Sequence, residues 1–233
     1  MDLLQPNKRQ QTMQPMLFVQ RSSKMMLKLA ETFTSIQGEG HLTGKRMFFI
    51  RFGGCTVSQC FMHPVNTNTC DTDWKAKTKL DKDGIDALVQ EAMQAVGSGG
   101  WVSVTGGEPT DQAQAMNYLI GELRNKGAQV NIQTAGLKII PCPWDWLTVS
   151  PKGTLEETKQ DFGQELKLVY TGQSLDELEQ WFKGTKFWNY YLMPYWENGK
   201  SNVEETVEAV HKCFERGLRF ELTQQTHKWA NVR

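Results

Sequence analysis

The chain has 233 residues, of which 39% are apolar and 22% charged, an ordinary mix for a globular protein. Basic and acidic residues number 26 each, so the formal net charge is zero, and no broad basic field argues for direct nucleic-acid binding. No apolar run reaches the length of a membrane span, and the polar N-terminal stretch lacks the features of a secretory signal, so we expect a cytoplasmic protein without membrane contacts.

The polar segment 1–25 precedes the first patterned segment of the chain. We expect residues 1–25 to form a flexible extension and residues 26–233 to form a single domain. Apolar runs rich in branched and aromatic residues then predict strands at 27–36, 46–52, 101–105, 129–134, 146–150, 165–170, 187–193 and 218–224.

Amphipathic helices are expected between several of these strands. Apolar residues share one helical face at 85–96 and again at 116–123, and Gly127 is a plausible stop for the second helix. Two pairs have the spacing of capping boxes and predict further helices, namely Ser174 with Glu177 and Ser201 with Glu204.

The alternation of strands and helices predicts an α/β fold, a parallel sheet curved into a full or partial TIM-like barrel with helices outside. Functional loops then follow the carboxyl ends of the strands. Candidate motifs stand after the first three strands, at 37–40, 55–70 and 106–108. We therefore expect these three motifs to converge on one rim of the barrel.

Three of the five cysteines, Cys55, Cys60 and Cys70, fall within sixteen residues. Without an export signal they are read as reduced thiols, suited to metal ligation. Three thiolates can hold a four-iron cluster and leave one iron open to another ligand. A Cys3His zinc loop that includes His63 is equally compatible with these residues alone.

The other two cysteines, Cys142 and Cys213, are isolated, and we expect both to be ordinary buried thiols. The tryptophans and tyrosines at 187–196 are expected in the core or at a dimer interface.

The sequence VTGGEPT occupies residues 104–110, after a predicted buried strand. A glycine pair lets the backbone approach a ligand closely, and Glu108 offers a carboxylate to an ammonium group. A lone GGE sequence is weak evidence for a binding site, because most glycine pairs are only turns. A GGEP loop downstream of a three-cysteine loop is much stronger evidence.

With these motifs the chain resembles the radical S-adenosylmethionine superfamily and, within it, the 7-carboxy-7-deazaguanine synthases. The resemblance runs from about Phe33 to the C-terminus. It rests on the segments FTSIQGEG (33–40), FIRFGGC (49–55), CDT (70–72), VTGGEPT (104–110), SPK (150–152), ELK (165–167) and QTHK (225–228).

The resemblance implies a shortened barrel, a homodimer and a flavodoxin-type electron donor. It implies ring contraction of the small-molecule substrate 6-carboxy-5,6,7,8-tetrahydropterin to 7-carboxy-7-deazaguanine, with release of ammonia, in queuosine or deazapurine biosynthesis. The implied cofactors are a [4Fe-4S] cluster on Cys55, Cys60 and Cys70, S-adenosylmethionine, and Mg²⁺ on Thr72, whose hydroxyl is a hard oxygen ligand.

The resemblance also assigns residues to the two small molecules. The cofactor would be held by Gly106, Gly107, Glu108, Ser150 and Lys152. The substrate would be held by Gln37, Gly38, Glu39, Arg51, Thr105, Gln225 and His227. An amide and a carboxylate, as in Gln37 and Glu39, suit the amino–imino edge of a pterin, although such residues also occur in plain turns. Arg51 could clamp a substrate carboxylate or pair with a structural one.

The chain also departs from the family pattern. Thr67 stands where the family's second cysteine is usual, and Cys60 lies seven residues earlier. We favour Cys60 as the replacement ligand in a remodelled loop, with His63 as the lesser option. QTAG (133–136) and MPYW (193–196) also differ from the family. Two other functions stay open, namely an activase that acts on a protein partner and a non-catalytic zinc-stabilised binding module.

Overall fold

The computed structural model describes residues 25–57, 72–197 and 200–232. All but the last residue of the expected extension 1–25 therefore lies outside the described part. The elements are β1 (Leu27–Ile36), β2 (Arg46–Phe52), β3 (Thr78–Leu80), α1 (Lys82–Val96), β4 (Trp101–Gly106), the 3₁₀ helix η1 (Pro109–Gln112), α2 (Ala113–Asn125), β5 (Gln129–Thr134), β6 (Trp146–Val149), β7 (Phe162–Tyr170), α3 (Leu175–Gly184), β8 (Lys186–Pro194), β9 (Trp196–Glu197), β10 (Lys200–Ser201), α4 (Val203–Glu215), β11 (Phe220–Leu222) and α5 (Thr226–Trp229).

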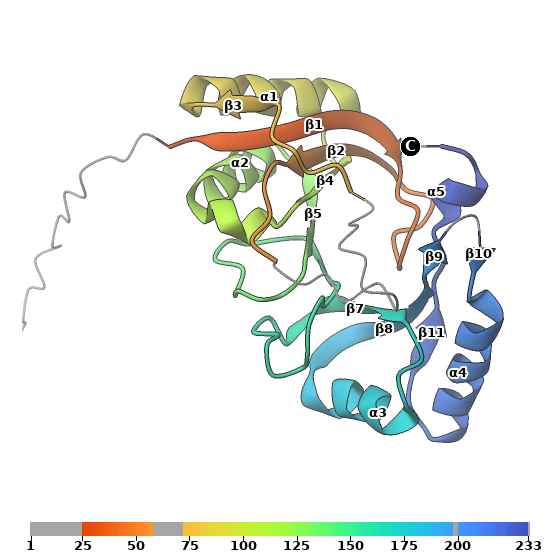
Figure 1. Ribbon diagram of the computed structural model, residues 1–233. Helices are drawn as coiled ribbons and strands as arrows, with labels where there is room; N and C mark the ends of the chain where they lie inside the picture. Colours follow the sequence, from red (N-terminus) through yellow and green to blue (C-terminus); the bar gives the residue numbers. More distant parts are fainter. Residues whose placement is uncertain (1–24, 58–71, 198–199, 233) are drawn as a thin grey trace, which may run out of the picture.

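A single curved sheet organises the molecule, with helices on its outer side (Figure 1). Its nine strands follow the order β11-β8-β7-β6-β5-β4-β2-β1-β3, so β11 and β3 are edges and the sheet does not close. Within this sheet every pairing from β2 to the β11 edge is parallel. Strands β9 and β10 form a separate antiparallel pair. The predicted α/β fold with a partial barrel is therefore confirmed, in an open form.

The first strand departs from the prediction of a purely parallel sheet. β1 pairs antiparallel with β2, with Ile36 opposite Arg46. The connection between them spans only residues 37–45, which is too short for a parallel crossover of a dozen or more residues. Hydrogen bonds from Gln37 N to Lys45 O (2.8 Å) and from Gly44 N to Gln37 O (2.8 Å) close this connection as a hairpin.

The main hydrophobic core lies between the outer face of the sheet and the helices. Alternate strand residues point into it, because successive side chains of a strand face opposite sides. Fully buried examples from five neighbouring strands are Ile50, Val104, Ile132, Leu147 and Leu166. A second, smaller cluster of Leu42, Met47 and Phe49 forms on the opposite face, packed against Phe33, Trp101 and Trp146.

The helix ends confirm two predictions and correct a third. Ser174 and Glu177 form a complete capping box at the start of α3, and Gly127, with φ of 85°, follows the end of α2. The predicted capping box at Ser201 is wrong, because Ser201 belongs to β10 and pairs with Trp196. Asn202 precedes α4 instead, without a side-chain cap.

Both isolated cysteines are buried as expected, and burial raises the pKa of each thiol to about 11. Tyr190 and Tyr191 are also buried, whereas Trp188 is exposed. Within the described ranges, no helix is both long and apolar enough to cross a bilayer.

Candidate functional site

The inner face of the sheet carries a row of buried polar side chains from four neighbouring strands. Ser103 Oγ donates to Asn131 Oδ1 (3.0 Å), and Asn131 Nδ2 donates to Thr148 Oγ1 (3.2 Å). Thr148 Oγ1 then donates to Glu165 Oε1 (2.7 Å). Each member is at most 3% exposed, so these hydrogen bonds provide polar partners that water would otherwise supply. It forms a rigid polar floor opposite the apolar face that packs on the helices.

The GGEP loop leaves the carboxyl end of β4 and lies directly on the backbone that follows β2. Gly106 has φ of 135°, and a Cβ there would overlap the backbone of Phe52. A Cβ at Gly107 would overlap the carbonyl oxygen of Gly54. Gly107 N donates to Phe52 O (3.1 Å) and Glu108 N to Gly54 O (3.2 Å). Glycine is therefore required twice, as the close backbone approach predicts.

Cys55 lies against this same loop. The position that a Cβ would take on Gly107 is only 2.9 Å from the Cβ of Cys55. The next residue is anchored as well, because Asp111 of η1 accepts from Thr56 N (2.8 Å) and Thr56 Oγ1 (2.7 Å). The first predicted cluster ligand and the predicted cofactor loop are thus brought together.

Several predicted residues of the cysteine loop lie outside the described residues, namely Cys60, His63, Thr67 and Cys70. Among the residues that the structure does describe, no group of three or more histidine, cysteine or acidic side chains could hold a metal ion. Thr72 is described and half-buried, at the start of the segment that leads to β3.

Glu108 is buried inside the loop, with 2% of its surface exposed. Its carboxylate accepts from Thr110 N (3.0 Å), Thr110 Oγ1 (2.7 Å), Thr134 Oγ1 (2.8 Å) and Ala135 N (2.8 Å). Three of these donors bind one carboxylate oxygen, Oε1, and only Ala135 N binds the other, Oε2. In this structure Glu108 therefore ties the GGEP loop to the end of β5.

The other predicted cofactor residues, Ser150 and Lys152, follow the carboxyl end of β6. Lys152 Nζ donates to Ser150 Oγ (3.1 Å), and Ser150 N donates to Thr134 O (2.8 Å). Parallel strands end at the same edge of a sheet, so this pair shares an edge with Cys55 and Gly107.

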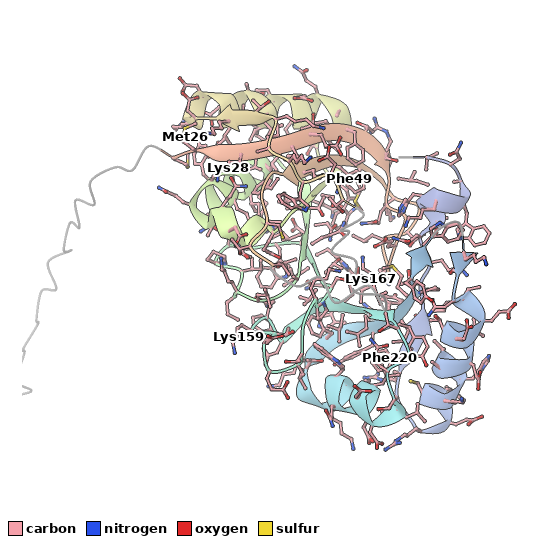
Figure 2. All side chains as sticks on the ribbon, viewed as in Figure 1. Met26, Lys28, Phe49, Lys159, Lys167 and Phe220 are labelled. Atoms are coloured by element: carbon pink, nitrogen blue, oxygen red, sulfur yellow. The ribbon has the colours of Figure 1, made fainter. Side chains whose placement is uncertain are left out.

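A second group of predicted residues surrounds Glu39, in the connection between β1 and β2. The Glu39 carboxylate forms an ion pair with Lys167 of β7 and accepts from Gln225 Nε2 (2.9 Å). Gln37 is buried, and its side-chain oxygen accepts from Glu39 N (3.2 Å). Lys167 points to the inner side of the curved sheet (Figure 2).

Electrostatics keep Glu39 ionised. Burial alone would raise the pKa of this carboxyl, but attraction and hydrogen bonding from Lys167, helped by Gln225, outweigh it and lower the pKa to about 2. Glu39 is therefore an acceptor across the whole neutral range.

The C-terminal segment meets the same connection across the opening of the sheet. Thr226 N donates to Gly38 O (2.9 Å), and Gly40 N donates to Thr223 Oγ1 (2.7 Å). A Cβ on Gly38 would overlap Nδ1 of His227. Gln37, Gly38, Glu39, Gln225 and His227, separated by nearly the whole chain, thus form one cluster.

Arg51 lies on the inner face beside Thr105, its partner in the register of β2 and β4. Its Nε pairs with Glu31 Oε1 at 2.9 Å, and its guanidinium lies 5.6 Å from the centre of the Phe33 ring. The sequence left open whether Arg51 pairs with a carboxylate of the protein itself. In the structure it does, and the partner is Glu31 on the neighbouring strand β1.

The expected convergence of three motifs on one rim needs correction. The cysteine, GGEP and SPK motifs follow parallel strands and share an edge. The Glu39 motif follows β1, which runs the other way, so it leaves the sheet beside the start of β2. It reaches the inner face through Lys167 and the C-terminal segment.

Sequence reasoning assigned no role to Lys167 or Glu165, although both belong to the ELK motif. Their signal is an alternation of charges with Leu166 and Leu168 in a strand that is otherwise buried. Glu31 carried no comparable signal, because its partner is known only from the pairing of β1 with β2.

Known proteins resemble the chain over most of its length. A 7-carboxy-7-deazaguanine synthase from Bacteroides thetaiotaomicron is 35% identical over 90% of this chain and 100% of its own, and one from Bradyrhizobium diazoefficiens is 32% identical over 90% and 100%. The crystal structure of QueE from Escherichia coli superimposes with a TM-score of 0.59 at 24% identity, over 87% of this chain and 95% of that one. No protein-family model matches.

The extent of these matches excludes a similarity limited to the GGEP loop or the cysteine segment. The two synthases are covered over their full length, and the fold similarity to the solved structure extends over 87% of this chain. The chain therefore belongs to the 7-carboxy-7-deazaguanine synthase family.

Proposed function

We propose that this chain is a radical S-adenosylmethionine enzyme that converts 6-carboxy-5,6,7,8-tetrahydropterin to 7-carboxy-7-deazaguanine with release of ammonia. Family membership supports the reaction. The observation that carries it in this chain is the packing of Cys55 on Gly107, because the chemistry needs a thiolate-held cluster next to a cofactor loop.

The residues around Cys55 fit a cluster and its cofactor. Among the residues that the structure describes, none lies within 4 Å of the position that a side chain on Gly54 would take, so these residues leave room beside the backbone that precedes Cys55. Cys55 would be one of three thiolate ligands, with Cys60 and Cys70. Gly106, Gly107, Ser150 and Lys152 would hold the cofactor, with Glu108 at the back of the loop. When bound, the reduced cluster and S-adenosylmethionine supply a 5′-deoxyadenosyl radical.

The Glu39 cluster is the proposed substrate site. The Glu39 carboxylate has about four lone-pair sites, of which Lys167 and Gln225 use two, so it can still accept from the amino–imino edge of a pterin. Gln37 and His227 would border the same ring, with the Gly38 backbone between them. Arg51 and Thr105 would meet the substrate carboxylate, which then competes with Glu31 for the guanidinium.

Four finer assignments belong to the same proposal. Thr72 would give a hydroxyl oxygen to Mg²⁺, which otherwise keeps water and substrate oxygens as ligands. The protein would work as a homodimer and would receive electrons from a flavodoxin-type donor. Residues 26–233 would act as one catalytic domain, because one nine-stranded sheet includes strands from both ends of this range, β1 and β11.

Anaerobic reconstitution with iron and sulfide tests the function. The protein should turn brown, and addition of carboxytetrahydropterin, S-adenosylmethionine and a reductant should give a deazapurine chromophore and ammonia in equal amounts. A colourless protein that retains only zinc would refute the proposal and favour the zinc-loop alternative.

The identity of the second ligand has its own test. Cys60→Ala should lose the cluster, measured as iron and acid-labile sulfide per chain, whereas Thr67→Ala should keep it. A full cluster in Cys60→Ala would show that another residue, such as His63, supplies the ligand.

A further inference from the structure

Two opposite charges stand two residues apart in the buried strand β7. Glu165 is 3% exposed and Lys167 is 4% exposed, and both face inward, while Leu166 and Leu168 between and beside them face the main core. Burial of a charge is costly unless the charge is paired and hydrogen bonded. The partners of these two residues therefore indicate what the charges stabilise.

Both charges bind the same short segment, residues 39–41, more than a hundred positions away in the chain. Lys167 Nζ pairs with the Glu39 carboxylate. Glu165 Oε2 accepts from His41 N (2.9 Å), while its other oxygen accepts from Thr148 of the polar floor (2.7 Å). Two inward residues of β7 thus hold alternate residues of the segment, one by its side chain and one by its backbone.

The segment fits tightly between these two charges. A Cβ on Gly40 would overlap one carboxylate oxygen of Glu165 and lie 2.7 Å from the other. The imidazole of His41 stacks on Trp146 with ring centres 4.8 Å apart. Glu39 is therefore placed by β7 as well as by its own hairpin.

We propose that Glu165 and Lys167 are positioning residues for the substrate, which clamp residues 39–41 so that Glu39 presents its carboxylate to the pterin edge. The inference rests on the proposed function, because it takes Glu39 as a substrate contact. Neither residue needs to touch the substrate.

Removal of Lys167 should change the pKa of Glu39, an effect that would not be expected if Lys167 only stabilised the fold. Burial is the largest influence on the pKa of Glu39, and Lys167 provides the two largest opposing ones, so the pKa rises when Lys167 is removed. Glu165 on β7 is a like charge that acts in the same direction. Gln225 and His227 on the C-terminal segment oppose the rise only in part. Glu39 then becomes protonated as pH falls and ceases to accept.

The first experiment compares substrate affinity in the reconstituted protein. Lys167→Met should weaken substrate binding about 10- to 100-fold, the range expected for a charge-assisted hydrogen bond. The ratio of its dissociation constant to that of the wild type should fall as pH rises. In Glu39→Gln/Lys167→Met this ratio should not change with pH, because glutamine does not titrate. Cluster content and cofactor affinity should stay at wild-type values in the double variant.

The second experiment measures, in the absence of substrate, how firmly the clamp holds residues 39–41. Amide hydrogen exchange in residues 37–41 should be faster in Lys167→Met and Glu165→Gln than in the wild type. Lys212→Met is the matched control, since it removes a lysine from an exposed pair with Glu208 on α4 and should change neither exchange nor affinity.

The outcomes separate the two proposals. Unchanged exchange in both β7 variants, or a pH-independent affinity ratio in Lys167→Met, would overturn the clamp. A different outcome is faster exchange in the β7 variants together with a wild-type protein that neither binds nor converts carboxytetrahydropterin. The clamp on residues 39–41 would then stand, but its role in substrate positioning and the proposed function would both be overturned.

Discussion

The α-carbon of Gly38 lies directly against the imidazole of His227, so closely that even a methyl group on Gly38 would overlap the Nδ1 atom. The two residues belong to opposite ends of the chain, and the hydrogen bond from Thr226 N to Gly38 O (2.9 Å) holds them in place. The contact joins the hairpin after β1 to the segment after β11, and so bridges the opening of an unclosed sheet.

Gly38→Ala should therefore displace His227 and weaken substrate binding by about tenfold or more, as lost geometry at a binding site does. Calorimetric titration with carboxytetrahydropterin measures the effect. Gly121→Ala is the control, because no residue in the described part of the chain lies within 4 Å of the added methyl group. This change should be neutral or slightly stabilising. Equal affinity in both variants would contradict the contact.

Glu108→Gln should destabilise the protein by about 1–3 kcal/mol, because the amide nitrogen that replaces one oxygen faces hydrogen-bond donors at a buried position. Urea unfolding measures this loss. Cofactor binding should weaken as well, since the GGEP loop loses its tie to β5. Glu215→Gln, on the exposed end of α4, serves as the control. Wild-type stability in Glu108→Gln would show that the four bonds contribute little.

The low pKa of Glu39 predicts a particular acid response. A carboxyl with a lowered pKa stabilises the fold above its ordinary value of 4.5, and this stabilisation is lost as pH falls toward about 2. The wild type should therefore lose stability more steeply over this window than Glu39→Gln/Lys167→Met, which lacks both charges. Chemical unfolding at a series of pH values gives the comparison. Parallel curves would mean that the Glu39 pKa is not lowered.

The two serines with capping-box spacing should respond differently. Ser174→Ala should cost about 1 kcal/mol of stability, because Ser174 caps α3 and accepts from Glu177 N (3.3 Å). Ser201→Ala should cost distinctly less, since Ser201 lies in β10 and caps no helix. Urea unfolding of both variants decides, and an equal loss in the two would contradict the observed start of α4.

Local pattern predicted the longer strands and the four main helices of this protein, and for β1, β2 and β5 even their bounds. It gave no sign of the short elements β3, η1, β9, β10 and α5. Alternating apolar residues choose between helix and strand within a few positions, and the glycine pair of the GGEP loop demands close backbone contact wherever it lies. The motifs FTSIQGEG, CDT and VTGGEPT likewise indicated the family from the sequence, as the relatives confirm.

Tertiary structure alone decided the direction of β1 and the partners of the charged residues. Ser201 has the spacing of a cap, yet strand pairing takes it away from the helix. Glu31 pairs with Arg51, and Lys167 with Glu39, across strands whose adjacency no local pattern encodes. The physical reason is the sequence distance over which each effect acts. Hydrophobic periodicity is set by residues a few positions apart, whereas a buried charge is stabilised by residues that only the folded chain brings beside it.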